Sequence, residues 1–97
     1  MPKPYKPLFT LGQVVMTQGI HQLVFEDKLN FADLMTMLLK HQAGDWGEVD
    51  VEDREVNDRA LATNEHLVSV YTINETRIWV ITEADRSSTT ILLPEEY

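Results

Sequence analysis

The last third of the chain has an extended pattern of apolar residues. Two runs rich in β-branched and aromatic residues, 67–73 and 76–82, are separated only by Asn74 and Glu75. This arrangement predicts a β-hairpin. A third apolar run, 89–93, follows after a polar loop. Because short connections join antiparallel neighbours, we expect a three-strand antiparallel meander.

The residues before this meander predict one short strand and three helices. Residues 11–16 contain a β-branched pair and favour a strand, whose place in the sheet the sequence leaves open. Apolar residues recur at helical spacing in 18–25 and, more weakly, from 51 to about 62. The segment beginning at residue 51 is mostly charged with a narrow apolar seam, so this helix should lie on the surface.

The clearest helix begins after Asn30, a good N-cap residue with Asp33 three positions later. Its apolar residues form a broad stripe that we expect to pack on the sheet. They are Phe31, Leu34, Met35, Leu38 and Leu39. Lys40 and His41 suit the carbonyl end of a helix, and Gly44 is the expected residue just beyond it.

This order of elements predicts an α+β fold. With 97 residues the chain has the length of one domain. We assign residues 1–10, which hold three of the four prolines, to an extended N-terminal arm, and residues 11–97 to a single α+β domain. The expected sheet is small and antiparallel: the meander and a possible N-terminal strand, packed with two to three helices.

Charge and composition exclude several classes of function. Sixteen acidic and eight basic residues give a formal net charge of −8, which disfavours direct binding to nucleic acid. No apolar run is long enough to span a membrane, and the first residues lack the apolar core of a signal peptide. The absence of cysteine removes disulfides and thiolate chemistry. We therefore expect a cytoplasmic protein that does not bind membranes.

Acidic residues are concentrated between positions 45 and 58. They are Asp45, Glu48, Asp50, Glu52, Asp53, Glu55 and Asp58. Acids at a helix start suit the helix dipole, which is the simplest explanation. The alternative is an acidic surface that docks a basic protein or imitates DNA phosphates. The candidate partner-binding residues are Asp45, Trp46, Glu48, Glu52 and Glu55.

Trp46 lies in a glycine-bounded loop, and Trp79 lies in the second meander strand. Trp46 is either a loop anchor packed into the core or an exposed hot spot for a partner. Trp79 points away from the face of its sequence neighbours, and we expect it to form a second apolar face with Tyr71 and Ile81. The N-terminal arm or a second copy would cover that face, so a two-fold homodimer is one interpretation.

Glu83, Asp85 and Arg86 form the candidate site loop. Paired carboxylates can perform acid–base chemistry or bind a divalent cation. The simpler interpretation is a turn in which Arg86 bridges a nearby carboxylate. His21, His41 and His66 are scattered and lack the short spacing of zinc ligands, so we predict neither a metal site nor a cofactor and assign no catalytic residue.

Three blocks of sequence resemble a known family. They are LGQVVMTQGI from Leu11, HQAGDWGEVDVED around Asp45, and SVYTI through WVITEADRSSTTILLPEEY at the end. Together they cover most of the chain beyond residue 10. The chain resembles a widespread family of small bacterial proteins of about this length, found in many genomes and on mobile elements. Members are generally uncharacterised, and some are labelled as subunits of type I restriction–modification systems.

The resemblance implies a class of protein but no established chemistry, and no cofactor loop or catalytic motif of a DNA methyltransferase occurs in these residues. Three functions stay open. The first, which we favour, is a small acidic interaction protein, non-enzymatic and encoded on a mobile element, that binds a host or element protein. The second is a DNA mimic that inhibits a defence or DNA-binding protein. The third is a small enzyme or ligand-binding protein that uses Glu83, Asp85 and Arg86.

Overall fold

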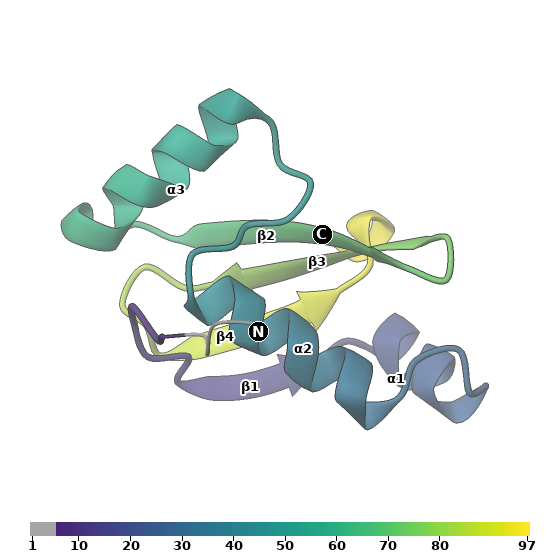
Figure 1. Cartoon of the computed structure of the whole chain (residues 1–97). Helices are drawn as coiled ribbons and strands as arrows, with labels where there is room; N and C mark the ends of the chain where they lie inside the picture. The colour runs from purple at the N-terminus through teal and green to yellow at the C-terminus, as the bar shows by residue number, and fades with distance from the viewer. Residues whose placement is uncertain (1–5) are drawn as a thin grey trace.

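The computed structural model describes residues 6–97 and shows helices arranged around a four-stranded sheet (Figure 1). The elements in chain order are β1 (Gln13–Met16), α1 (Gln18–Phe25), α2 (Phe31–Gln42), α3 (Val51–Thr63), β2 (Leu67–Ile73), β3 (Thr76–Thr82), β4 (Ser88–Leu92) and the 3₁₀ turn η1 (Pro94–Glu96). This arrangement confirms the predicted α+β fold. Each predicted helix and strand is present, with boundaries that differ by at most two residues.

The sheet has the strand order β1-β4-β3-β2. The meander β2-β3-β4 is antiparallel, as predicted. The expectation of an all-antiparallel sheet was wrong in one respect, because β1 runs parallel to β4. The N–H groups of Gln13 and Thr17 donate to the carbonyls of Ser87 and Ile91. The sheet is therefore mixed, and β1 and β2 form its two edges.

Helix α2 begins with a complete capping box. The Asn30 side chain accepts from the Asp33 N–H at 2.8 Å, and the Asp33 carboxylate accepts from the Asn30 N–H at 3.1 Å. The chain leaves the helix through Gly44, whose φ of +82° is easily adopted only without a β-carbon. Both ends of this helix are therefore set by local sequence, as predicted.

The predicted buried stripe of α2 was partly wrong. Leu34 and Leu38 are buried, but Phe31, Met35 and Leu39 are 75%, 38% and 44% exposed. The helix instead buries Met37 and His41. The physical reason is that α2 packs across β2 and β3, so the flank of the stripe that faces β1 lies over a part of the sheet that no helix fills.

The prediction for the second face of the sheet was also partly wrong. Tyr71 pairs with Ile78 and belongs to the main core, so it does not lie with Trp79 as predicted. Trp79 and Ile81 do share the other face. There the C-terminal segment supplies cover, because the Tyr97 ring lies 5.3 Å from that of Trp79, edge to face.

The described part of the predicted N-terminal arm is attached to the domain. The Leu8 N–H donates to the Gln42 carbonyl at 2.8 Å. The Phe9 ring packs against the rings of His41 and Trp46. Residues 1–5 lie outside the described chain. No helix within residues 6–97 has the length and apolar character needed to cross a membrane.

Candidate functional site

Helix α3 lies beside the β2 edge of the sheet and is attached to it by few side chains (Figure 1). Asp50 caps its N-terminus by accepting from the Asp53 N–H at 2.8 Å. Only Asn57 and Ala60 of the helix are buried. The Asn57 amide donates to the Val68 carbonyl at 2.7 Å and accepts from the Val68 N–H at 3.1 Å. Asn57 thus takes the place of a neighbouring strand along this part of β2.

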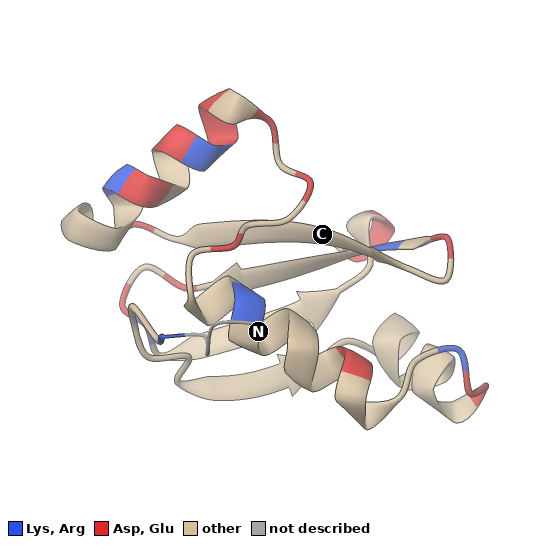
Figure 2. Ribbon diagram, viewed as in Figure 1, with Lys and Arg blue, Asp and Glu red and all other residues tan. Residues whose placement is uncertain are grey.

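Figure 2 marks acidic positions along α3, and the burial of each residue shows that their side chains are exposed. Glu52 and Glu55 lie on the side opposite the buried Asn57, because successive residues turn by about 100° along a helix. Within residues 6–97 there are only two ion pairs, Glu26 with Lys28 and Glu48 with Arg77. The acids of α3 are therefore not neutralised by basic side chains of the fold.

Trp46 is a core residue and not an exposed hot spot. Its side chain is 2% exposed, and its indole N–H donates to Asp58 at 3.0 Å. It packs with Ala60 and Leu67, so the anchor interpretation holds and Trp46 must be removed from the partner-binding set. Deep burial follows because the loop passes along β2, where the Trp46 carbonyl accepts from the Val70 N–H.

The remaining members of the predicted set differ in their surroundings. Asp45 is exposed, and its carboxylate accepts from the Gly47 N–H at 3.3 Å within the loop. Glu48 is half-exposed and pairs with Arg77 at 3.5 Å. Glu52 and Glu55 stay available on α3. Two of the four acids therefore lie on the loop before α3 and two on α3 itself, and they do not form a catalytic arrangement.

A cleft of about 340 Å³ separates α3 from the second face of the sheet. Its apolar walls come from Val56, Val68, Val70 and Trp79, and its polar lining includes Asp53 and Glu65. Trp79 is only partly buried there. We call these lining residues the α3 cleft.

Sequence reasoning missed the α3 cleft as a site. One signal was available, because the two-residue turn at Asn74 and Glu75 sets the register that places Val70 opposite Trp79. That register predicts which residues of the sheet form one wall of the cleft. It does not predict the position of α3, which depends on Asn57 and on the path of the preceding loop.

In the candidate loop of Glu83, Asp85 and Arg86, the Arg86 side chain has a structural role. The Arg86 guanidinium donates to the Ala60 carbonyl in the last turn of α3 at 2.9 Å and to the Glu65 carbonyl just beyond the helix at 2.6 Å. It also donates to the Glu83 and Ala84 carbonyls at 3.2 Å. The expected bridge to a carboxylate was wrong, since the partners are all backbone carbonyls. Arg86 thus ties this loop to the end of α3.

The two acids of that loop are exposed. The Asp85 carboxylate accepts from the Ser87 N–H at 3.0 Å, and hydrogen bonds from Ser87 lower its pKa. Glu83 continues the chain from β3, where its backbone N–H and carbonyl serve the turn. The loop therefore closes on itself, in agreement with the simpler of the two interpretations.

His41, expected at an ordinary helix end, lies in a buried polar chain. The Thr89 hydroxyl donates to the Leu11 carbonyl at 2.7 Å, so its oxygen accepts from Thr82 at 2.7 Å. The Thr82 oxygen then accepts from Nε2–H of His41 at 2.9 Å. This leaves Nδ1 to accept from the Ser69 hydroxyl at 2.5 Å. The chain of donors fixes the neutral Nε2–H tautomer.

The His41 ring is completely buried between Phe9 and Trp46. Burial, with a smaller contribution from the Arg86 charge, lowers the pKa of His41 to about 3. A ring that is inaccessible and neutral cannot reach a substrate, so His41 organises the fold. His21 and His66 are exposed elsewhere. Within the described chain, no three His, Asp or Glu side chains gather into a group that could hold a metal ion.

Comparisons with protein-family models, with curated protein sequences and with solved structures found no match to this chain.

Proposed function

We propose that this protein is a non-enzymatic interaction protein that binds a basic segment of a partner protein at the α3 cleft. The observation that carries the proposal is the combination of a partly exposed Trp79 with the carboxylates of Asp53 and Glu65 in one cleft. Because the sequence resembles proteins encoded on mobile elements, we take the partner to be a host or element protein.

The chemistry of the cleft favours lysine and arginine side chains. Their aliphatic stems can lie on Val68 and Val70 while the charged head reaches a carboxylate. Trp79 adds a cation–π contact, which is typically about 0.5–1 kcal/mol at a partly exposed site. Asp53 makes no ion pair within residues 6–97, so a bound cation does not have to displace an internal partner.

Several contacts are needed for useful affinity. An exposed ion pair contributes only about 0.2–1 kcal/mol, and salt weakens it further. Glu52 and Glu55 are exposed on the opposite side of α3 from Asn57, where further basic residues of the partner would meet them. The proposed interaction is therefore of moderate affinity, fast to form and strongly dependent on ionic strength.

A peptide experiment tests this function directly. A displayed peptide library is selected against the protein, and the affinity of a selected peptide is measured by calorimetry at low and moderate salt. The double variant Asp53→Asn/Glu65→Gln should bind at least about tenfold more weakly. The matched control is Asp27→Asn/Glu75→Gln, which changes the charge equally at exposed positions away from the cleft. Selection of non-basic peptides, or equal losses in both variants, would contradict the proposal.

Competition with DNA distinguishes a DNA mimic from an interaction protein that binds some other kind of partner. If the natural partner is a DNA-binding protein, double-stranded DNA should compete with this protein for it, because both present closely spaced negative charges. A partner bound at the α3 cleft without such competition would exclude mimicry and leave the interaction function in place.

A further inference from the structure

The two edges of the sheet are treated differently by the fold. The β2 edge is covered by the Trp46–Glu48 segment, which pairs with Val70, and by the side chain of Asn57. At the β1 edge, Gln13 and Thr17 direct their N–H groups to β4. Alternation along the strand therefore turns the N–H and carbonyl groups of Val14 and Met16 outward. Within residues 6–97, no hydrogen bond reaches these outward groups.

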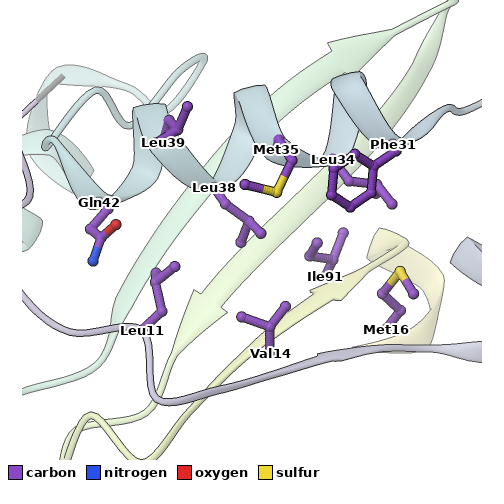
Figure 3. Close-up of a pocket in the computed structure, with 10 residues that line it drawn as sticks. All are labelled: Leu11, Val14, Met16, Phe31, Leu34, Met35, Leu38, Leu39, Gln42 and Ile91. Atoms are coloured by element: carbon purple, nitrogen blue, oxygen red, sulfur yellow. The ribbon is translucent and has the colours of Figure 1, made fainter. Parts of the chain in front are cut away.

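An apolar groove of about 410 Å³ adjoins the same edge (Figure 3). Val14 and Met16 of β1 form one side, and Phe31, Met35 and Leu39 of α2 form the other. Val14 is 41% exposed and Phe31 is 75% exposed. The groove is the uncovered flank of the α2 stripe, next to an edge strand without the lysine, proline or bulge that commonly protects such edges.

We propose that a second copy of this chain occupies the β1 edge, with the two β1 strands antiparallel about a two-fold axis at Val15. In that register Val14 of each copy lies opposite Met16 of the other. The outward N–H and carbonyl groups of these residues then make four hydrogen bonds between the copies. The two sheets become one continuous sheet, and no outward group at the seam is left without a partner.

The side chains follow the same symmetry. Opposed residues of antiparallel strands point to the same face, so Val14 of one copy meets Met16 of the second on the groove side. The two grooves merge over the seam, and each copy brings Phe31, Met35 and Leu39 to its margin. A small apolar molecule would fill only the groove and leave the main-chain groups unpaired, whereas a second copy satisfies both.

The distribution of charge also favours this face. Each copy carries a net charge of −8, so two copies can approach closely only where acidic side chains are absent. None of the residues that line the groove is charged. The acidic helix α3 lies at the β2 edge, the opposite end of the sheet, so it points away from the seam (Figure 2).

The expected interface is of moderate size. The exposed side chains of the groove and edge offer on the order of 400 Å² of apolar surface per copy, within the range of functional patches. Two copies with their strand edges then bury about 1,000 Å², near the lower limit for a specific interface. The dimer should therefore form reversibly, in the micromolar range.

Sedimentation equilibrium of the full chain from about 1 µM to about 1 mM tests the proposal. The native protein should shift from monomer to dimer, and the Val14 and Met16 amides should become protected from hydrogen exchange as concentration rises. Val14→Lys and Phe31→Gln should each raise the dissociation constant at least about tenfold. The matched controls Val51→Lys and Phe25→Gln change exposed residues of the same types outside the groove and should dimerise normally.

Circular dichroism checks that each variant is folded, and Phe31→Gln decides the question if Val14→Lys does not fold. A native protein that stays monomeric throughout would overturn the proposal. So would dimers that persist in both groove variants. Selection of an extended apolar peptide that adds to β1 of a monomeric protein would assign the edge to a foreign strand instead. These readouts do not depend on the α3 cleft, so the two proposals fail separately.

Discussion

At the scale of single residues, a directed chain of hydrogen bonds passes through the buried His41 ring. It begins at Ser69 on β2 and ends at the Leu11 carbonyl, which precedes β1. Its members come from α2 and three strands, so it fixes where the helix sits on the sheet. The cost of burying these polar groups is offset only while each of them keeps its partner.

The free energy of unfolding should depend on pH, because His41 is neutral in the fold and becomes protonated in the unfolded chain at mildly acidic pH. Its pKa is about 3 in the fold against 6.5 for the free side chain, so the unfolded chain binds more protons between these values. Stability from this group is therefore complete above pH 6.5 and falls as pH decreases toward 3. The advantage of the native protein over His41→Gln should narrow by about 2–3 kcal/mol between about pH 7.5 and pH 4.5.

Urea unfolding at both pH values measures this difference. His66→Gln is the control, because its ring is exposed and the substitution should leave the pH dependence unchanged. An advantage over His41→Gln that stays constant across this range would mean that folding does not lower the pKa of His41.

At the scale of elements, α3 owes its position to polar contacts at three points and to little apolar packing. The Trp46 indole N–H donates to Asp58, Asn57 bonds to β2, and Arg86 binds carbonyls at the C-terminal end of the helix. The apolar contribution is limited to Ala60 and Leu61 beside Trp46. One wall of the α3 cleft therefore depends on a few hydrogen bonds.

Replacing Arg86 should loosen α3 without removing a catalytic group. Arg86→Ala leaves the partly buried Ala60 carbonyl without its charged donor and should lower the free energy of unfolding by about 1–2 kcal/mol. The free energy of unfolding of Arg86→Lys should lie between those of the native protein and Arg86→Ala, because an ammonium group cannot reproduce the several directed hydrogen bonds of a planar guanidinium. Chemical denaturation and hydrogen exchange of the last turn of α3 measure the effect, with exposed Arg59→Ala as control. Unchanged stability together with lost ligand binding would support the alternative in which Glu83, Asp85 and Arg86 form a site.

At the scale of the whole molecule, the sheet separates two surfaces of different chemistry. The acidic α3 cleft lies at the β2 edge, and the neutral apolar groove lies at the β1 edge. In the proposed dimer the two clefts lie at the far ends of the joined sheet. Each cleft therefore stays open to a partner, and the dimer presents two such sites.

Binding at one edge should not affect the other. We expect the monomeric Val14→Lys variant to bind the selected basic peptide with an affinity within about twofold of the native protein. Likewise, Asp53→Asn/Glu65→Gln should leave the dimer dissociation constant unchanged. Calorimetry and sedimentation on the same samples measure both quantities. A tenfold change in either cross-test would show that the two edges are coupled through the sheet.

The sequence by itself determined what depends on near neighbours in the chain. The hairpin at Asn74, the capping box at Asn30 and the start of α3 at Asp50 arise from short-range hydrogen bonds and from the spacing of apolar residues, and all were predicted. The acidic surface was also visible, because the seven acids among positions 45–58 cannot all be buried or neutralised by Arg54, the one basic residue of that segment.

Only the tertiary structure decided which of these features meet. The parallel pairing of β1 with β4 joins residues more than 70 positions apart, and nothing local encodes it. The register of β2 against β3 placed Tyr71 and Trp79 on opposite faces. The position of α2 buried His41 and left Phe31 exposed. Burial of Trp46 and the engagement of Arg86 with carbonyls likewise depend on distant partners. Long-range packing therefore decided both candidate surfaces, because each lies between elements that are far apart in the chain.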